Sequence, residues 1–216
     1  QIGLLNALVL PALRGSAAGA DDDAFVDCDD ARVDCFVPSV YTQRLRAHGT
    51  VSDVEDVRVV TGLRIENSAW NGYIPDEVAS LSLQQLLLIR TNIGGTLPAA
   101  LGALSLTLEH LDVSECALSG TLPTALGQLT ALRTLNLDHN ALRGTVPTEF
   151  GRLRALESLR VDNNRLVGTV PEEVVSLTQF QLQYLYFHSN NLRGVVSAGL
   201  RSLRAHTTCN LGCSAD

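Results

Sequence analysis

Hydrophobic residues recur along most of the chain at a fixed spacing. Residues 132–155 read LRTLNLDHNALRGTVPTEFGRLRA, and residues 156–179 repeat the pattern as LESLRVDNNRLVGTVPEEVVSLTQ. Six such copies align from residue 60 onward on a Gly that is followed three residues later by Pro, with Ser197 replacing the Pro of the last copy. A period of 20–29 residues is typical of a solenoid, in which stacked copies bury a core that no copy could bury alone.

Within each copy, a Leu-x-Leu alternation predicts a short strand whose apolar side chains face one way. Stacked copies then form a parallel sheet, and a later Leu in each copy closes the core from the opposite side. We therefore expect an α/β solenoid, a curved right-handed superhelix with a parallel concave sheet and an irregular or 3-10 convex side. The predicted inward strand residues are Leu63 and Ile65, Leu86 and Leu88, Leu111 and Val113, Leu135 and Leu137, Leu159 and Val161, and Leu185 and Phe187.

One polar column lies four residues before the Gly of each copy. A buried Asn at such a turn can satisfy backbone groups of its own loop and of the neighbouring loop, so we expect a ladder that fixes the stacking. Cys116 occupies this column and is interpreted as a buried structural thiol rather than a reactive one. The column reads Ser68, Thr91, Cys116, Asn140, Asn164 and Asn190.

These motifs resemble the leucine-rich repeats of the plant type, over about residues 60–203. The shared pattern is L-x-x-L-x-L-x-x-N-x-L followed by G-x-[I/L/V]-P, as in receptor-kinase ectodomains and polygalacturonase-inhibiting proteins. The GTLP of residues 95–98 and 120–123 is similar to the repeats of trypanosomatid surface antigens. The plant N-terminal cap usually carries a Trp between its cysteines, and residues 28–35 have none. The resemblance implies an extracellular, non-catalytic recognition protein with capped ends.

The chain divides into four predicted regions, and two of them are caps. Residues 1–20 are an apolar segment, residues 21–59 an acidic linker and N-terminal cap, residues 60–203 the six repeats and residues 204–216 the C-terminal cap. Residues 38–47 predict a capping helix that begins after Ser39. Two interpretations of residues 1–20 stay open. They are either a signal remnant, with a small-x-small cleavage pattern before Asp21, or a retained helix whose residues 2–13 lie against an apolar surface or a membrane interface.

Composition narrows the possible functions. The formal net charge is −7 and all sixteen basic residues are Arg. No basic stripe is available for phosphates, so we expect no nucleic-acid partner. The sequence contains no phosphate loop, nucleophile elbow or paired-His metal motif, and a shallow sheet offers no enclosed pocket. We therefore expect no catalysis, no cofactor and no metal.

The strand positions that alternate with the leucines give the candidate contact surface. Tyr and Arg are enriched at binding hot spots, which favours the C-terminal copies. Aspartates with His139 form a polar middle, and an outward apolar pair at residues 87 and 89 is expected to be covered by a partner or by the N-terminal segment. These positions face solvent on the concave sheet, and the alternative to a contact role is that they are only its solvated positions. The predicted partner-binding residues are Leu87, Ile89, Asp112, Asn136, Asp138, Arg160, Asp162, Tyr184, Tyr186 and His188.

Two hypotheses of function follow. In the first, the protein is secreted or displayed at the cell surface and binds a protein, or a polysaccharide, on the concave sheet. In the second, it is a structural or accessory subunit of a larger, membrane-associated assembly in an organelle lumen, contacted through its N-terminal segment.

Cysteine positions give a first testable prediction. Cys28 and Cys35 flank the repeats on one side, and Cys209 and Cys213 on the other, so two short-range disulfides would pin the caps in an oxidising compartment. A zinc site would instead need all four thiols together. Each disulfide should contribute about 2 kcal/mol, because the loops are short. A non-reduced peptide map should show both pairs, and a bridge to Cys116 would contradict them.

Overall fold

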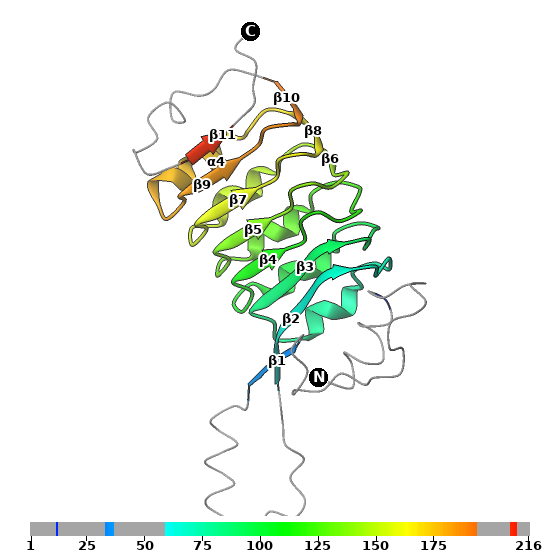
Figure 1. Cartoon of the computed structure of the whole chain (residues 1–216). Helices are drawn as coiled ribbons and strands as arrows, with labels where there is room; N and C mark the ends of the chain where they lie inside the picture. Colours follow the sequence, from blue (N-terminus) through cyan, green and yellow to red (C-terminus); the bar gives the residue numbers. More distant parts are fainter. Residues whose placement is uncertain (1–11, 13–32, 37–58, 194–207, 211–216) are drawn as a thin grey trace, which may run out of the picture.

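A long parallel sheet forms the concave side of the protein. The computed structural model describes residues 12, 33–36, 59–193 and 208–210. Figure 1 shows the repeat strands stacked in chain order, with the short helices on the opposite side. Among the described residues, the concave sheet contains β1 (Val33–Phe36), β2 (Val59–Ser68), β3 (Gln85–Thr91), β4 (His110–Asp112), β5 (Thr134–Asn136), β7 (Ser158–Arg160), β9 (Tyr184–Tyr186) and β11 (Thr208–Asn210).

All neighbouring strands of this sheet are parallel except β1, which pairs with β2 in the antiparallel sense. β1 and β11 come from the segments predicted as caps, and they extend the sheet beyond the repeats at both ends. The predicted capping helix at 38–47 and the side chains of Cys28, Cys35, Cys209 and Cys213 lie outside what the structure describes. The disulfides and the domain boundaries therefore stay predictions.

The core lies between the concave sheet and the convex helices. All twelve predicted inward strand residues are buried, and so is the Leu that closes each described copy from the convex side. The alternation of burial follows from the strand geometry, because successive side chains point to opposite faces. The predicted solenoid fold, with its parallel sheet and short helical elements, is confirmed.

Short helical turns line the convex side, and each of the five described copies starts its turn after a Pro. The Pro has an extended backbone and precedes the first helical residue, where a missing N–H costs no hydrogen bond. Neighbouring turns approach closely, since a Cβ added at Gly127 would lie 2.5 Å from the carbonyl oxygen of Glu149. These elements are η2 (Asp76–Ser80), η3 (Ala99–Leu104), η4 (Thr124–Gln128), η5 (Thr148–Arg152), α4 (Glu172–Val175) and η6 (Ser176–Gln179). None of the helices in the described residues is long and apolar enough to cross a membrane.

A second, narrow sheet follows the turn after each concave strand. It consists of β6 (Arg143–Gly144), β8 (Arg165–Gly168) and β10 (Asn191–Leu192), and isolated bridges continue it toward the first copy as far as Tyr73. The backbone N–H of Tyr73 also donates a hydrogen bond to the carbonyl oxygen of Ala12, at 2.8 Å. This contact from the N-terminal segment lies on the narrow sheet, away from Leu87 and Ile89 on the concave strand β3.

The predicted Asn ladder joins the two sheets. The side-chain N–H₂ of Asn164 donates to the carbonyl oxygens of Val161 and Asp162 in its own copy and of Leu137 in the preceding copy, at 2.9–3.2 Å. Its side-chain oxygen accepts the backbone N–H of Leu142 at 3.0 Å. Asn140 and Asn190 repeat the arrangement. The ladder therefore satisfies buried backbone groups in two copies at once.

The residue before each member of the column has a left-handed backbone. The φ angles of these six residues lie between 50° and 54°, in a region that non-glycine residues seldom occupy. The turn reverses the chain direction sharply enough to bring the Asn amide under the carbonyls of the preceding strand. The six residues are Asn67, Arg90, Glu115, His139, Asn163 and Ser189.

Substitution of the central ladder residue tests the role of the amide. Asn164→Asp keeps the shape but replaces the donor with an acceptor that faces three carbonyl oxygens. We expect a loss of about 2 to 4 kcal/mol in the free energy of unfolding, measured by urea denaturation. Asn191→Asp, at an exposed position of β10, is the matched control and should change stability by less than about 0.5 kcal/mol. Equal losses in the two variants would show that the amide donors do not hold the stack.

Candidate functional site

The parallel register collects the predicted contact residues into rows across the concave sheet. Asn136 of β5 pairs with Arg160 of β7, which pairs in turn with Tyr186 of β9. Tyr184 lies two residues earlier on β9, and its side chain is 45% exposed. Neighbouring strands in a sheet are about 4.8 Å apart, so side chains in a row lie within reach of one another.

Arg160 and Tyr186 form the centre of the site. The guanidinium carbon of Arg160 lies 5.2 Å from the ring centroid of Tyr186, in a cation–π contact. The ring of Tyr186 also meets the imidazole of His188 edge to face, with centroids 6.3 Å apart and an interplanar angle of 73°. The repeat register predicts these residues at one end of the surface, and the structure brings them together there.

Two aspartates lie beneath Arg160 instead of facing solvent. Asp138 is 5% exposed and Asp162 is 1% exposed, so the expectation that both are solvated is wrong. Asn136 and Ser114, at 8% and 4%, are also buried. These are short side chains in a concave face, where the longer side chains of adjacent strands cover them.

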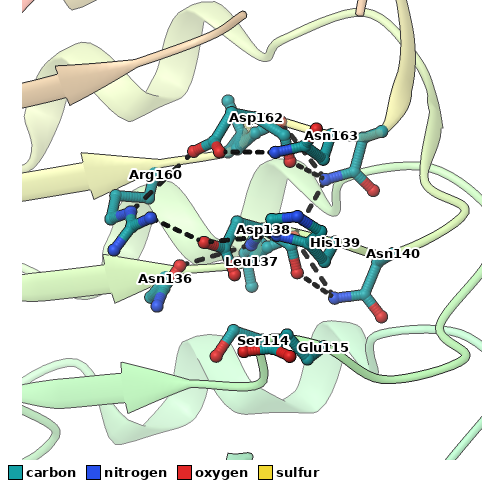
Figure 2. A network of polar contacts seen from close by, with 12 residues as sticks. Ser114, Glu115, Asn136, Leu137, Asp138, His139, Asn140, Arg160, Asp162 and Asn163 are labelled. Carbon is teal, nitrogen blue, oxygen red and sulfur yellow. Dashed lines mark hydrogen bonds and ion pairs between the residues drawn. The ribbon is translucent and has the colours of Figure 1, made fainter. Parts of the chain in front are cut away.

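Arg160 neutralises part of this buried negative charge. Its terminal nitrogen lies 2.8 Å from Oδ2 of Asp138, and its Nε lies 3.8 Å from Oδ1 of Asp162. Figure 2 shows the guanidinium between the two carboxylates, with contacts to both. Arg160 is therefore bound to the protein itself, and its side chain is only 41% exposed.

Imidazole and amide groups complete the surroundings of the carboxylates. Nδ1 of His139 lies 3.6 Å from Oδ2 of Asp138, and Nε2 of His188 lies 3.4 Å from Oδ2 of Asp162. The same Asp162 oxygen accepts a hydrogen bond from the side-chain nitrogen of Asn163 at 2.8 Å. Asn163 was not among the predicted contact residues, because its contact depends on the left-handed backbone at that residue.

Four polar atoms of this cluster are buried and have no hydrogen-bond partner among the described residues. They are Oδ1 of Asp138, Oδ1 of Asp162, Nε of Arg160 and Nδ1 of His188. Buried polar groups are nearly always paired, and each unpaired one costs about 1 to 3 kcal/mol. The cluster is thus the place on the concave face where polar groups are least well satisfied.

The incomplete pairing of these buried groups also affects the pKa of Asp138. Burial raises the pKa of this carboxyl above its usual range, and the positive charge of Arg160 opposes the rise. The neighbouring carboxylate of Asp162 raises the pKa further, whereas His139 lowers it. Burial therefore outweighs the ion pair.

Asp112 and Asn136 have a structural role as well as a place on the surface. Oδ1 of Asp112 accepts the backbone N–H of Ser114 at 3.0 Å, and Oδ1 of Asn136 accepts that of Asp138 at 3.3 Å. The two side chains are also linked, because Nδ2 of Asn136 donates to Oδ2 of Asp112 at 3.1 Å. Each side chain thus caps the end of its own strand.

Leu87 and Ile89 do not belong to this cluster. They lie on β3, and β4, β5 and β7 separate them from Tyr186 on β9. Both are half-buried within the sheet. Leu87 pairs with Asp112 of β4, so the ten predicted residues lie on one continuous surface with an apolar end on β3 and a polar and aromatic end on β7 and β9.

Cys116 is half-buried rather than fully buried. Its thiol donates to the carbonyl oxygen of Leu88 at 3.0 Å and lies 3.1 Å from the hydroxyl of Thr91. Burial raises the pKa of this thiol, which keeps it protonated and makes it a poor nucleophile. The position therefore fits the structural role that the repeat pattern predicts.

Within the part of the chain that the structure describes, Asp138, His139 and Asp162 are grouped closely enough to hold a metal ion. One ligand atom from each lies within 4.8 Å of the others. Arg160 already places a positive charge 2.8 Å from Asp138, so a metal would have to displace this guanidinium. The geometry therefore favours an internal ion pair.

The pKa of Asp138 is a measurable property of this cluster. Arg160→Gln should raise it further and Asp162→Asn should lower it, as followed by the carboxyl carbon shift in an NMR pH titration. Because the pKa is higher in the folded chain than the ordinary value of about 3.9, the contribution of Asp138 to stability is present below that value and is lost as the pH rises through the folded pKa. Asp76→Asn, at an exposed site in η2, should leave the titration unchanged. A downward shift in Arg160→Gln would contradict the assignment.

Comparison with known proteins agrees with this geometry. Residues 107–166 and residues 181–203 match two family models described as leucine-rich repeats. No curated protein matches the sequence.

Solved structures with the same fold include receptor ectodomains. The leucine-rich-repeat ectodomain of the receptor kinase SOBIR1 from Arabidopsis thaliana has 28% identity and a TM-score of 0.64, over 76% of this chain and 84% of that chain. A TDR receptor has 31% identity and a TM-score of 0.61, over 72% of this chain and 26% of that chain. The Arabidopsis receptor kinase HAESA, solved with the peptide hormone IDA and the co-receptor SERK1, has 29% identity and a TM-score of 0.62, over 67% of this chain and 24% of that chain. The chain thus spans about a quarter of the two longer receptor chains. Together with the repeat pattern, these matches identify the chain as a leucine-rich-repeat protein of the plant type.

Proposed function

We propose that this chain is a recognition module that binds a protein partner on the concave sheet, outside the cell. The contact is centred on β7 and β9. The observation that carries the proposal is the cluster of Tyr184, Tyr186 and Arg160 on these neighbouring strands, where an exposed aromatic ring lies beside a cation–π pair.

The chemistry of these side chains supports a binding role. Tyr and Arg supply large contact areas with polar ends and are enriched among residues that dominate binding energies. Arg160 is fixed by Asp138 and the ring of Tyr186 is packed against it, so little side-chain freedom is lost on binding. A surface whose side chains are already ordered before binding loses less conformational entropy on binding, which favours it as a contact site.

The structural neighbours support the same class of function. HAESA was solved in complex with a peptide hormone and a co-receptor, and SOBIR1 was solved as an ectodomain. An extracellular location and a protein partner follow for this chain by analogy with them. We expect no catalysis, because an acid/base pair needs an enclosed site that excludes water, and the concave sheet is open.

Because Arg160 forms ion pairs within the protein, its substitution is a poor test of partner binding. From the sequence alone, Arg160→Ala would remove a surface contact and leave stability unchanged. In the structure it would also leave two buried carboxylates uncompensated, at a cost of about 3 to 5 kcal/mol. The two tyrosines therefore test binding more cleanly.

The proposal is tested by locating the partner and then weakening the contact. A photoreactive amino acid at position 184 should cross-link to the partner, and the same group at position 152 on the convex side should not. Tyr186→Ala should then weaken binding of the cross-linked partner by about 2 kcal/mol, or roughly 30-fold, with little change in Tm.

Tyr73→Ala is the matched control, because Tyr73 is 57% exposed and lies on the narrow sheet. Its affinity for the partner should equal that of the unmodified protein. Cross-linking from position 152 or through the N-terminal segment, with Tyr186→Ala without effect, would overturn the proposal in favour of the assembly hypothesis. A polysaccharide recovered at position 184 would keep the surface and change the class of partner.

A further inference from the structure

Negative charge is in excess on the concave face around Tyr186. We count the outward positions of β4, β5, β7 and β9, and the next position on the same face after each strand. These positions contain three carboxylates, those of Asp112, Asp138 and Asp162. They contain one guanidinium, that of Arg160. With neutral histidines, this part of the sheet has a formal net charge of −2.

Water screens this charge poorly. Asp138 and Asp162 are at least nine-tenths buried, and one oxygen of each has no hydrogen-bond partner among the described residues. Charges held in a low-dielectric, concave surface project a stronger potential than the same charges on an open surface. Arg160 neutralises one carboxylate, which leaves the surface beside it negative.

The aromatic rings lie where this potential emerges. Tyr186 contacts His188, and His188 lies 3.4 Å from Oδ2 of Asp162. Tyr186 already has a guanidinium against its ring, which shows that this environment stabilises a cation next to a tyrosine. Tyr184 is the more exposed of the two rings and has no cation–π contact among the described residues.

We propose that the partner presents a basic segment to this surface, and that one arginine or lysine side chain of the segment lies against Tyr186 and His188, above the buried Asp162. The inference rests on the proposed function and specifies the chemistry of the partner. An acidic partner is disfavoured because Arg160 is occupied by Asp138 and Asp162 and is outnumbered by carboxylates.

The subsite can be tested without knowing the partner. The probe is Nα-acetyl-arginine amide, added to the isotopically labelled protein and followed by NMR, with the uncharged Nα-acetyl-citrulline amide as the matched control. The arginine probe should shift the signals of residues 160–162 and 184–188 in a saturable way, and the citrulline probe should not. Raising the ionic strength from about 50 mM to about 500 mM should weaken the arginine binding, since salt screens the attraction.

Variants locate the charge that attracts the probe. Asp162→Asn should lower the affinity for the arginine probe about threefold or more, and Asp138→Asn should do the same if the first variant is poorly folded. Asp76→Asn, on the convex side, should leave it unchanged. The salt dependence of the unmodified protein tests the same attraction without any substitution.

Several results would overturn the subsite. One is equal binding of the arginine and citrulline probes, and another is the absence of saturable shifts. A third is the same set of shifts caused by Ca²⁺ or Zn²⁺ alone with no response to the arginine probe, which would make the cluster a metal site.

The two proposals fail separately. If a partner cross-links at position 184 and Asp162→Asn leaves its affinity unchanged, the recognition function stands and the basic subsite is wrong. If the arginine probe binds as expected and no partner cross-links at position 184, the cation subsite stands and the recognition function is wrong.

Discussion

The structure depends on how the chain turns after each concave strand. Backbone carbonyls at this turn lie inside the protein, where an unpaired group is costly. A single Asn amide binds carbonyls of its own copy and of the preceding copy, and its oxygen accepts an N–H from the preceding copy. The amide reaches them because the residue before it has a left-handed backbone. Since each amide joins two copies, neighbouring strands have one allowed register, and every outward side chain has a fixed neighbour on the next strand.

This fixed register explains why charges are buried on a face that the sequence marks as solvated. Asp138 and Asp162 follow equivalent strands, and Arg160 lies between them. The stack brings two like charges close together, and one guanidinium stabilises both. Arg160 is thus first a structural residue. On β9, Tyr186 is half-buried against Arg160 and His188, whereas Tyr184 keeps 45% of its surface exposed.

The sequence predicts the repeat, the core and the ladder, because each follows from a periodic pattern. Leu135 and Leu137 are buried as the alternation requires, and Asn140 and Asn164 make the bonds expected of that column. Burial of Asp138 could not be predicted in this way. It depends on the length of the side chain on the next strand and on the concave shape, and neither is encoded in the alternation of one strand. The contact between Asn163 and Asp162 has the same origin, since it requires a backbone angle that the residue pattern does not reveal.

The first three copies lack the Asn amide, and in the first two a longer strand pairing replaces it. The hydroxyls of Ser68 and Thr91 each accept the backbone N–H two residues ahead, and that of Thr91 also contacts the thiol of Cys116. The thiol of Cys116 binds the carbonyl of Leu88 in place of an amide. β2 and β3 compensate with ten and seven residues and pair from Gly62 to Ser68, whereas later strands pair over three residues.

The two ways of holding the stack produce different surfaces. Two long strands form the first part of the concave face, with the ion pair of Arg64 and Glu66 outward on β2 and the apolar Leu87 and Ile89 outward on β3. Short strands ended by polar turns form the second part, which allows charged and aromatic side chains to gather there. The centre of the candidate site, Arg160 and Tyr186, therefore lies in copies that hold the Asn ladder, where the strands pair over three residues and the amides add further bonds between copies.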